Sequence, residues 1–489
     1  MILMPTYKLY IDGKWVSSES GKTFESLNPA TERPICRFQA GNEDDINKAV
    51  EAAQKAYENW KEVPPPKRAQ ILYRAAELLR KNKESLAKLV TTEMGKVIKE
   101  GRGDVQEAID TAEYFAGEGR RLFGHTTTSE LKNKFSMTVR MPVGVFGLIT
   151  PWNFPIGIPA WKIFPALVCG NTVVFKPSSD TPLCATKFVE LLIQAGVPKG
   201  VVNLVTGSGE DAGTPLIKHK DVRGISFTGN RETGEFILKN AGIKKVGLEL
   251  GGKNGIIIMP DADTGLALEG VVWGGFATAG QRCTATSRVI LHDSIKEKFE
   301  RVLAERARKL RLGSGLDPKT DIGPLINKAA VEKSERYTEI GKQEGAKLLI
   351  GGARPAGKGF FYKPTLFADV SPNMRIGQEE IFGPVVSLMS ARNIDEAIDI
   401  MNNIKYGLSS AIYTNNINYA FKAIQKIEAG LTYINSSTVG AEVHLPFGGV
   451  KQSGFTREAG WAGLEEFSEI KTVYVDFSGK LQRAQIDID

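Results

Sequence analysis

The sequence of 489 residues predicts an α/β protein that contains two parallel-sheet units. Short, continuously apolar runs alternate with amphipathic stretches, which is typical of parallel strands covered by helices on both faces. This alternation restarts after Gly280. At roughly 150 residues per domain the length corresponds to about three units, and one hydrophobic core stops growing beyond roughly 250–300 residues. A divided chain is therefore expected.

Two helices precede the first strand of the main sheet. The first begins near Asp44 after a polar cap, because the apolar side chains that follow recur at helical spacing on one stripe: Ile46, Val50, Ala53, Tyr57 and Trp60. Pro64-Pro65-Pro66 ends this pattern, and the second helix is predicted over residues 68–82.

The central part of the chain supplies the strands of the predicted sheet. The strands are expected at residues 144–150, 172–176, 201–206, 224–228 and 255–259. Amphipathic stretches at residues 185–195 and 233–240 separate them as helices. The sequence contains no internal repeat and no Ser/Gly linker, so the domains are expected to be interleaved.

The second α/β unit and two outlying strands follow from the rest of the chain. The unit is predicted to contain a strand at 287–291, helices at 294–310 and 328–344, and a strand at 347–350. Residues 132–141 and 471–477 look like exposed strands outside the main sheets. These two strands are expected to pair with each other or with a neighbouring subunit.

The composition excludes several classes of protein. Hydrophobic residues make up 42% and charged residues 24%, as is ordinary for a soluble globular chain, and Gly plus Pro is too low for collagen or disorder. The net charge is 63 minus 56, or +7, which is mild at this length. The densest basic stretch, residues 301–311, is interpreted as a solvated helix face, so no nucleic-acid partner is expected.

No membrane segment or secretion signal is expected, and the predicted location is cytoplasmic. The N-terminus lacks a basic region before its brief apolar run. Residues 141–161 carry no charge, but they contain four prolines, whereas a spanning helix must satisfy every backbone group internally. We interpret this segment as a buried strand followed by an active-site loop.

The four cysteines fit neither a disulfide framework nor a paired zinc site, so no metal is expected. Cys283 follows Arg282 among small and polar residues, and a neighbouring cation favours the thiolate. Lone cysteines are more often inert packing residues. We expect this for Cys36, Cys169 and Cys184.

Two glycine-rich turns each follow a strand and open a helix. The first is Gly207-x-Gly209 with Gly213 further on, and the second covers residues 227–234. Helix N-termini expose unpaired N–H groups and the positive end of a dipole, which suits a pyrophosphate. A tight turn between strand and helix explains either one equally well, but two in one unit favour a dinucleotide.

Two polar residues stand in apolar surroundings. Glu249 lies between Leu248 and Leu250 at a strand end, where a carboxylate is costly unless it is used or paired. The alternative to a catalytic role is an ion pair with Lys253. Asn153 lies in a charge-free loop set by prolines, and it is either a functional amide or a turn residue.

Taken together, these motifs resemble the aldehyde dehydrogenase superfamily over nearly the whole chain. The matching segments, in the family's order, are Pro151-Trp152-Asn153-Phe154-Pro155, Lys176-Pro177, Phe227-Thr228-Gly229-Asn230, Glu249-Leu250-Gly251-Gly252-Lys253, Gly280-Gln281-Arg282-Cys283, Glu379-Glu380-Ile381-Phe382-Gly383-Pro384 and Pro446-Phe447-Gly448-Gly449. Residues 283–288 and 440–449 are similar to the semialdehyde and glyceraldehyde dehydrogenases.

The resemblance implies two Rossmann-like domains and a small β oligomerisation extension. Residues 1–119 and 140–251 would form the NAD(P)-binding domain, and residues 252–449 the catalytic domain. Residues 120–139 and 450–489 would form the extension and C-terminal tail. The implied assembly is a homo-oligomer, either a dimer or a homotetramer.

By the same resemblance the catalytic residues are Cys283, Glu249, Asn153 and Lys162. Cys283 would attack the aldehyde to give a thiohemiacetal, and loss of hydride to NAD(P)+ would leave a thioester. Asn153 would hold the oxyanion, and Lys162 would be a structural or electrostatic member of the site. Glu249 would activate water, so that the product is a free carboxylic acid rather than an acyl-coenzyme A.

The cofactor is expected to be NADP, or else NAD. The residues implied in binding it are Thr150, Pro151, Trp152, Lys176, Ser178, Ser179, Gly209, Gly213, Phe227, Thr228, Gly229, Asn230, Thr233, Leu250, Gly251, Glu380 and Phe382. NAD-selective relatives often carry a glutamate where Ser179 stands, and Lys176 adds a positive charge. The alternative is that serine permits both cofactors.

The substrate pocket is implied to contain Phe154, Trp161, Arg282, Thr284, Glu442, His444 and Phe447. Arg282 and His444 would meet a distal carboxylate or a hydroxylated chain, unless they are surface or ion-pair residues. The expected substrate is 2-oxoglutarate or succinate semialdehyde, or glyceraldehyde. The alternatives are a broad-specificity aldehyde dehydrogenase, a thiol esterase, or a catalytically silent structural or binding protein.

Overall fold

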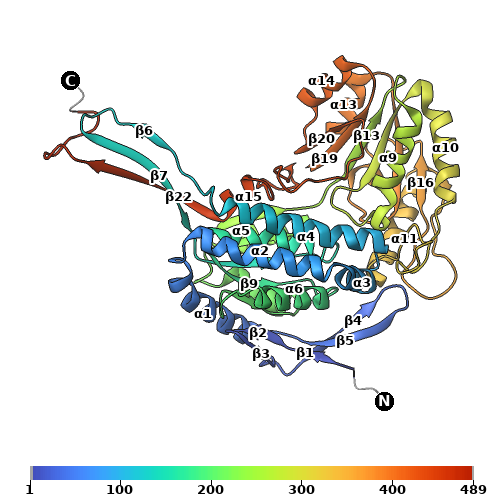
Figure 1. Ribbon diagram of the computed structural model, residues 1–489. Coiled ribbons are helices and arrows are strands. Elements are labelled where there is room, and N and C mark those ends of the chain that lie inside the picture. The colour runs from blue at the N-terminus through green and yellow to red at the C-terminus, as the bar shows by residue number, and fades with distance from the viewer. Residues whose placement is uncertain (1–3, 487–489) are drawn as a thin grey trace.

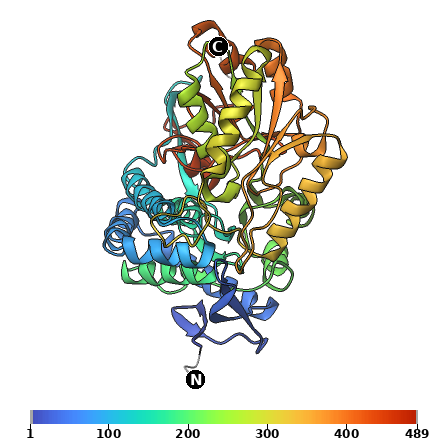
Figure 2. The same ribbon diagram turned by 90° about the vertical axis from the view of Figure 1, so that its right-hand side faces the viewer.

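The computed structural model describes residues 4–486, which form two seven-stranded sheets and a projecting arm. Figure 1 shows the first sheet and its helices below, the second sheet at the upper right, and the arm extending to the left. Figure 2, turned by 90°, shows the second unit seated on the first. The predicted α/β class with parallel sheets is confirmed, although antiparallel strands complete the sheet edges.

The first sheet has the strand order β12-β11-β8-β9-β10-β2-β3. Its strands are β2 (Leu9–Ile11), β3 (Lys14–Val16), β8 (Val145–Ile149), β9 (Thr172–Lys176), β10 (Val202–Leu204), β11 (Gly224–Thr228) and β12 (Lys245–Glu249). The five strands from β12 to β10 are parallel, whereas β2 runs antiparallel to β10. Every residue of β8 and β9 is buried, which explains their continuously apolar sequences.

Helices cover both faces of this sheet. They are α1 (Glu43–Trp60), α2 (Pro65–Lys81), α3 (Lys83–Met94), α4 (Ile98–Glu118), α5 (Gly157–Cys169), α6 (Pro182–Gln194), α7 (Thr214–Lys218) and α8 (Arg231–Asn240). Helix α1 begins at a capping box in which Asn42 and Asp45 bond each other's backbone N–H groups. The prolines that separate α1 from α2 occupy the first turn of α2, where an N–H has no helical partner.

The second sheet has the order β15-β16-β17-β14-β13-β19-β20 and is parallel except for β15. Its strands are β13 (Asn254–Ile258), β14 (Thr286–His292), β15 (Lys347–Ile350), β16 (Thr365–Ala368), β17 (Val385–Ala391), β19 (Ser409–Tyr413) and β20 (Leu431–Ile434). Its helices are α9 (Thr264–Phe276), α10 (Lys296–Arg308), α11 (Lys328–Gln343), α12 (Arg375–Gln378), α13 (Ile394–Asn402) and α14 (Ile417–Lys426).

The arm is a three-stranded sheet of β6 (Thr126–Thr128), β7 (Lys134–Pro142) and β22 (Ser468–Asp476). The two outlying strands predicted from the sequence pair with each other, antiparallel, with Val139 opposite Lys471. The remaining elements are the small sheet of β1 (Thr6–Tyr7), β4 (Thr23–Asn28) and β5 (Arg33–Gln39), the pair β18 (Tyr406–Gly407) and β21 (Val450–Lys451), and α15 (Ala462–Glu466).

Two expectations about elements are wrong. Residues 255–258 belong to β13 of the second sheet and do not extend the first, and Met259 follows the strand. The segment 141–161 is strand and loop only up to Ile156, because α5 begins at Gly157. Pro159 lies in the first turn of α5, where it is tolerated, and all thirteen residues of α5 are buried. Within residues 4–486 no helix is both long and apolar enough to cross a bilayer.

The functional residues lie where the two sheets meet. Because β8, β9, β11 and β12 are parallel, the residues at their carboxyl ends share one edge of the first sheet. These residues are Thr150, Lys176, Thr228 and Glu249. The chain then crosses from β12 to β13 in four residues, and Cys283 lies just before the amino end of the adjacent strand β14. Ligands of open α/β sheets bind beyond the carboxyl ends of the strands.

We predict that Ile290→Ala destabilises the unit that carries Cys283. Ile290 is fully buried on β14, and removing such a side chain costs about 2–5 kcal/mol of unfolding free energy. Urea unfolding followed by circular dichroism measures the change. Leu266→Ala on α9, at a side chain that is 50% exposed, is the matched control and should alter stability by less than about 0.5 kcal/mol. Equal losses in the two variants would contradict this packing.

Candidate active site

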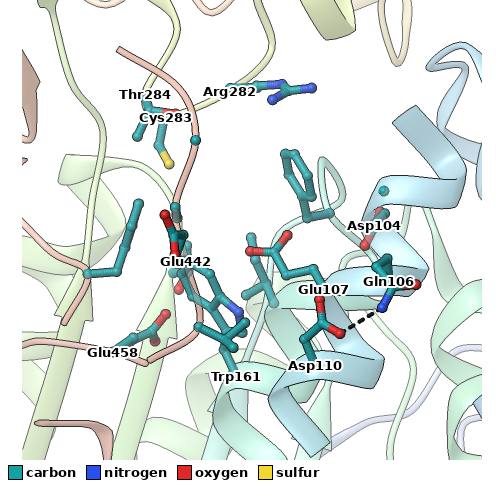
Figure 3. A pocket seen from close by; sticks show the side chains of 18 of the residues that line it. Asp104, Gln106, Glu107, Asp110, Trp161, Arg282, Cys283, Thr284, Glu442 and Glu458 are labelled. Carbon is teal, nitrogen blue, oxygen red and sulfur yellow. Dashed lines mark hydrogen bonds between the residues drawn. The ribbon is translucent and has the colours of Figure 1, made fainter. Parts of the chain in front are cut away.

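A cavity of about 540 Å³ lies between the two sheets and contains both Cys283 and Glu249. Its lining includes all seven predicted substrate residues: Phe154, Trp161, Arg282, Thr284, Glu442, His444 and Phe447. Figure 3 shows Cys283 on one side of this cavity and Glu107 and Asp110 entering from α4 on the other. Residues as far apart in the sequence as Glu100 and Glu458 thus line the same cavity.

The loop that carries Cys283 is held in a strained conformation. Thr278 and Ala279 both have positive φ angles, 52° and 54°, which are unusual for residues with a Cβ atom. The buried side chain of Gln281 fixes the loop by donating to Thr278 O and by accepting from Ile326 N (2.9 Å). Strain of this kind persists only where neighbouring structure holds it.

The thiol of Cys283 is not activated by a neighbouring cation. Burial, followed by the charges of Glu380 and Glu249, raises the pKa of Cys283 to about 12. The expectation that Arg282 favours the thiolate is wrong, because its guanidinium turns away and forms an ion pair with Glu100 at 3.1 Å. Cys283 therefore needs a base to lose its proton.

Glu249 is a buried carboxylate without a partner. Within residues 4–486 neither of its oxygens has a hydrogen-bond donor, and it is only 3% exposed. Burial, followed by the charge of Glu458, raises the pKa of Glu249 well above its ordinary value. Gly448 approaches closely, with a positive φ of 151°, and a Cβ there would lie 2.6 Å from Glu249 Oε1. The side chain is thus enclosed but remains available to react.

The alternative of an ion pair between Glu249 and Lys253 is not observed. The Nζ atom of Lys253 is fully buried and has no hydrogen-bond partner in the described part of the chain. Burial lowers the pKa of Lys253 to about 7. Glu249 and Lys253 therefore do not neutralise each other, and the Glu249 carboxylate lines the cavity without a cation from this motif.

Asn153 and Lys162 are buried close to the cysteine loop and to the cavity residue Glu458, respectively. Asn153 Nδ2 donates to Gln281 O at 3.1 Å, two residues before Cys283, and among residues 4–486 its second amide hydrogen has no acceptor. Lys162, fully buried on α5, donates to Ser226 Oγ at 2.8 Å and forms an ion pair with Glu458. Lys162 thus neutralises a carboxylate that itself lines the cavity beside Glu249.

The predicted cofactor residues on β9 lie at its carboxyl end. Lys176 is 6% exposed, and burial lowers its pKa to about 8. Ser179 Oγ donates to Gly207 O at 2.8 Å, so it connects the end of β9 to the first glycine-rich turn. Ser178 interacts locally with Asp180. Gly209 and Gly213 bound a short π-helical turn that precedes α7.

The second glycine-rich turn has the predicted local structure. Phe227 and Thr228 end β11, Gly229 follows, and Asn230 caps α8 by accepting from Thr233 N at 2.7 Å. The hydroxyls of Thr228 and of Thr150, at the end of β8, are buried without a partner among residues 4–486. Thr228 and Leu250 also line the cavity that contains Cys283.

Glu380 and Phe382 lie against the loop that follows β12. Glu380 Oε1 accepts from Gly252 N at 2.9 Å, and a Cβ on Gly251 would collide with this carboxylate. Phe382 packs edge-on against Trp152 with ring centroids 5.5 Å apart, and Pro151 adjoins Trp152. A larger side chain at position 251 would therefore displace the Glu380 carboxylate from its bond with Gly252 N.

The charged substrate residues are already paired. Arg282 bonds Glu100 and stacks over Phe154 and Trp273 at 5.3 and 5.1 Å from the ring centres. His444 and Glu442 are exposed and lie 3.6 Å apart. The ion-pair alternative therefore describes Arg282 and His444, and Arg282 does not stand ready for a substrate carboxylate. Trp161 and Phe447 pack edge-on at 4.9 Å.

Several residues of the site were missed in the sequence. Glu100, Asp104, Glu107 and Asp110 line the cavity from α4 at spacings of three or four residues. The available signal was the recurrence of acidic residues every three or four positions, which places them on one face of a helix. Gln281 stands in the motif that contains Cys283, but nothing local indicated its bond to Ile326 N or the ion pair of Glu458 with Lys162.

The remaining predictions concern the other three cysteines and a metal site. Cys36, Cys169 and Cys184 are buried free thiols, in agreement with a packing role. Across residues 4–486 the structure contains no group of three His, Cys, Asp or Glu side chains arranged to hold a metal ion.

The chain matches known proteins over nearly its entire length. The model of the aldehyde dehydrogenase family matches residues 15–473. The α-ketoglutaric semialdehyde dehydrogenase of Bacillus subtilis is 42% identical over 96% of this chain and 98% of its own. The D-glyceraldehyde dehydrogenase (NADP(+)) of Thermoplasma acidophilum is 39% identical over 97% of each chain.

Solved structures agree with these matches. The crystal structure of betaine aldehyde dehydrogenase from Staphylococcus aureus in complex with NAD+ is 38% identical, with a TM-score of 0.95 over 97% of this chain and 96% of that one. Together with the strained cysteine loop and the unpartnered buried carboxylate facing one cavity, these similarities establish that the chain belongs to the aldehyde dehydrogenase family.

Proposed function

We propose that this enzyme oxidises an aldehyde to the carboxylic acid through a thiohemiacetal and a thioester on Cys283, with NADP+ or NAD+ as acceptor. The single observation that carries the proposal is the cavity that brings the Cys283 thiol and the free carboxylate of Glu249 together. A thiol that must lose a proton and a base with a raised pKa are complementary groups.

The residues of the chain act in sequence. Glu249 takes the thiol proton directly or through water, and the Cys283 sulfur bonds to the aldehyde carbon. The free amide hydrogen of Asn153 and the backbone N–H of Cys283 hold the oxyanion, each worth about 3–4 kcal/mol. Glu249 releases the thiol proton to solvent, and as a carboxylate it removes a proton from the water that attacks the thioester. It then returns that proton to the departing Cys283 sulfur. The acid leaves, and the thiol of Cys283 is restored.

The residues at the strand ends fit a nicotinamide dinucleotide. Two buried hydroxyls, of Thr150 and Thr228, lack partners in the described part of the chain, and the N-terminus of α8 faces outward from the second turn. Glu380 would hold the nicotinamide ribose and Phe382 would support the ring. When bound, this group supplies the acceptor for the hydride that leaves the thiohemiacetal.

The preference for NADP+ rests on Ser179 and Lys176. Ser179 places no carboxylate at the end of β9, and Lys176 supplies a nitrogen, although burial reduces its charge near neutral pH. A relative with 39% identity is named for NADP(+), whereas a solved relative contains NAD+. The alternative, that serine permits both cofactors, predicts similar kcat/KM values.

The proposed substrates are 2-oxoglutarate or succinate semialdehyde, or glyceraldehyde. The names of the relatives include the first and the last of these. Broad specificity for aliphatic and aromatic aldehydes is the alternative. A substrate panel with both cofactors distinguishes them.

A homo-oligomer, dimer or tetramer, is proposed from the arm. Strands β7 and β22 expose Phe135, Ile470, Tyr474 and Val475, between 45% and 67% accessible. Apolar side chains gathered on a projecting ribbon are typical of an interface.

Two further expectations stay predictions. These are the domain limits at residues 119, 139, 251 and 449, and the cytoplasmic location.

We predict that Glu249→Gln lowers steady-state kcat by about 10²–10⁴-fold, because the base is lost while the shape is kept. Reduced-cofactor absorbance measures this. Because burial raises the pKa of Glu249, its base form is lost at a higher pH than for an ordinary glutamate. Wild-type kcat should therefore fall as pH drops through that pKa. Exposed Glu305→Gln is the control, and undiminished turnover in Glu249→Gln would exclude the assigned base.

We predict that Ser179→Glu shifts the preference from NADP+ towards NAD+. The new carboxylate repels a 2′-phosphate, so the ratio of kcat/KM for NADP+ to that for NAD+ should fall at least tenfold, about 1.4 kcal/mol. The uncharged variant Ser179→Gln should leave the ratio within about threefold. A wild type that strongly favours NAD+, with no change in Ser179→Glu, overturns the cofactor proposal.

We predict that the double variant Ile470→Asp with Tyr474→Asp dissociates the oligomer. Both side chains are more than 60% exposed on β22, so charges there should weaken association without disturbing a core. Analytical ultracentrifugation should show a smaller species than the wild type. Gln343→Asp, at an exposed position of α11, should retain the wild-type mass, and an unchanged mass in the double variant would place the interface elsewhere.

A further inference from the structure

One face of α4 forms an acidic wall opposite Cys283. Asp104, Glu107 and Asp110 line the cavity at spacings of three residues, and Glu100 extends the row by one turn. Figure 3 shows Glu107 pointing into the cavity, while Gln106 and Asp110 are bonded to each other beside it. The catalytic steps proposed above use none of these residues.

Three of the acids around the cavity are paired with cations of the chain itself. Glu100 pairs with Arg282, and Asp104 pairs with Lys96 at 3.2 Å. Glu458 pairs with Lys162 in the same way. The buried cations Lys96, Lys162 and Arg282 are thus committed to carboxylates that the protein already contains.

Glu107, on the same wall, has no such partner. Among residues 4–486 its carboxylate forms neither a hydrogen bond nor an ion pair, although the charges of Asp104, Asp110, Lys96 and Arg282 act on it. Burial, followed by the charge of Asp104, raises the pKa of Glu107 to about 8. At neutral pH it is therefore mostly a neutral acid, which both donates and accepts hydrogen bonds.

A substrate carboxylate finds only one unpaired lysine or arginine along this cavity among residues 4–486. Lys99 lines the cavity without an ion pair, but it is exposed, so solvent screens its charge. Arg282 and Lys96 are paired, and His444 lies beside Glu442. A second carboxylate would also face Asp110, which is held by Gln106 but not neutralised. Like charges in a partly buried site repel strongly.

A cationic substrate fits no better. Recognition of ammonium groups uses open aromatic faces. Here Lys96 lies 3.5 Å and Arg282 5.3 Å from the ring centre of Phe154, and Arg282 also covers Trp273. The chain's own cations thus occupy Phe154 and Trp273, and the other two aromatic rings that line the cavity, Trp161 and Phe447, pack edge-on against each other.

A hydroxyl group matches what remains. Trp161 lines the cavity, is 6% exposed, and its indole N–H has no acceptor within the described residues. Figure 3 shows the nitrogen of Trp161 on the side of Glu107. A hydroxyl can satisfy an unpartnered donor and a neutral carboxylic acid that line the same cavity, since a hydroxyl both accepts and donates.

We propose that Glu107, next to Trp161, is the specificity-determining residue of a hydroxyl-recognising subsite. This subsite selects short, uncharged hydroxyaldehydes over aldehydes that carry a second carboxylate or an ammonium group. The proposal rests on the proposed function, because the recognised aldehyde is the one that reacts at Cys283.

The experiment measures kcat/KM for glyceraldehyde, propanal, succinate semialdehyde and betaine aldehyde. The wild type should favour glyceraldehyde over the two charged aldehydes at least tenfold. Glu107→Ala should lower kcat/KM for glyceraldehyde at least tenfold but that for propanal by less than threefold, because propanal has no hydroxyl to bind. Glu107→Gln, which keeps a donor and an acceptor, should retain most activity with glyceraldehyde.

Glu113→Ala on α4 is the matched control. Glu113 is exposed and pairs with Arg80 outside the cavity, so this variant should leave the ratio of glyceraldehyde to propanal unchanged. Equal losses for glyceraldehyde and propanal in Glu107→Ala would assign Glu107 a structural role and overturn the proposal. A wild type that prefers succinate semialdehyde or betaine aldehyde would overturn it as well.

A second readout needs no cofactor. Glyceraldehyde and propanal should each protect Cys283 from iodoacetamide, and in Glu107→Ala the half-protecting concentration should rise at least tenfold for glyceraldehyde only. Equal shifts for both aldehydes overturn the subsite. If no aldehyde yields reduced cofactor while this selective protection persists, the proposed oxidation fails and the subsite stands.

Discussion

The side-chain amide of Asn254 holds together the backbone segments that meet at Cys283. Its Nδ2 atom donates to Cys283 O at 2.7 Å and to Ala285 O at 3.0 Å, and its Oδ1 atom accepts from Ser409 N. One buried amide therefore ties the start of β13 to the cysteine loop and to β19. The strained backbone at Thr278 and Ala279 depends on such restraints, and so does the direction in which the thiol points.

The electrostatics of the cavity follow from burial. In a low dielectric each charge needs a partner or changes its protonation state. Lys162 and Glu458 satisfy each other, as do Lys96 and Asp104. Glu249 and Glu107 have no such partner, and burial raises the pKa of both. These two carboxyl groups line the cavity without a hydrogen bond or ion pair among residues 4–486, and they are those to which we assign chemistry and recognition.

Much of the fold was predictable because its signals are local. Continuously apolar strands, helix caps and prolines are read within about ten residues, and β9 lies at residues 172–176 as expected. The errors arose where local patterns are ambiguous. Residues 255–259 read as one more strand, but the sequence around them does not say which sheet they join. The prolines of α5 read as loop, although one occupies a first turn.

By itself the sequence determined the reactive residues, since Cys283, Glu249 and Asn153 stand in recognisable motifs. Glu249 and Asn153 also stand among apolar residues, where burying a polar group costs free energy unless it is paired or functional. Only the tertiary structure decided their electrostatic state. Arg282 adjoins Cys283 in the chain, yet its charge goes to Glu100, 182 residues away. The acidic wall of α4 is likewise visible only once the helix is placed across from the cysteine loop. Charge interactions depend on distance in space, which short sequence motifs do not specify.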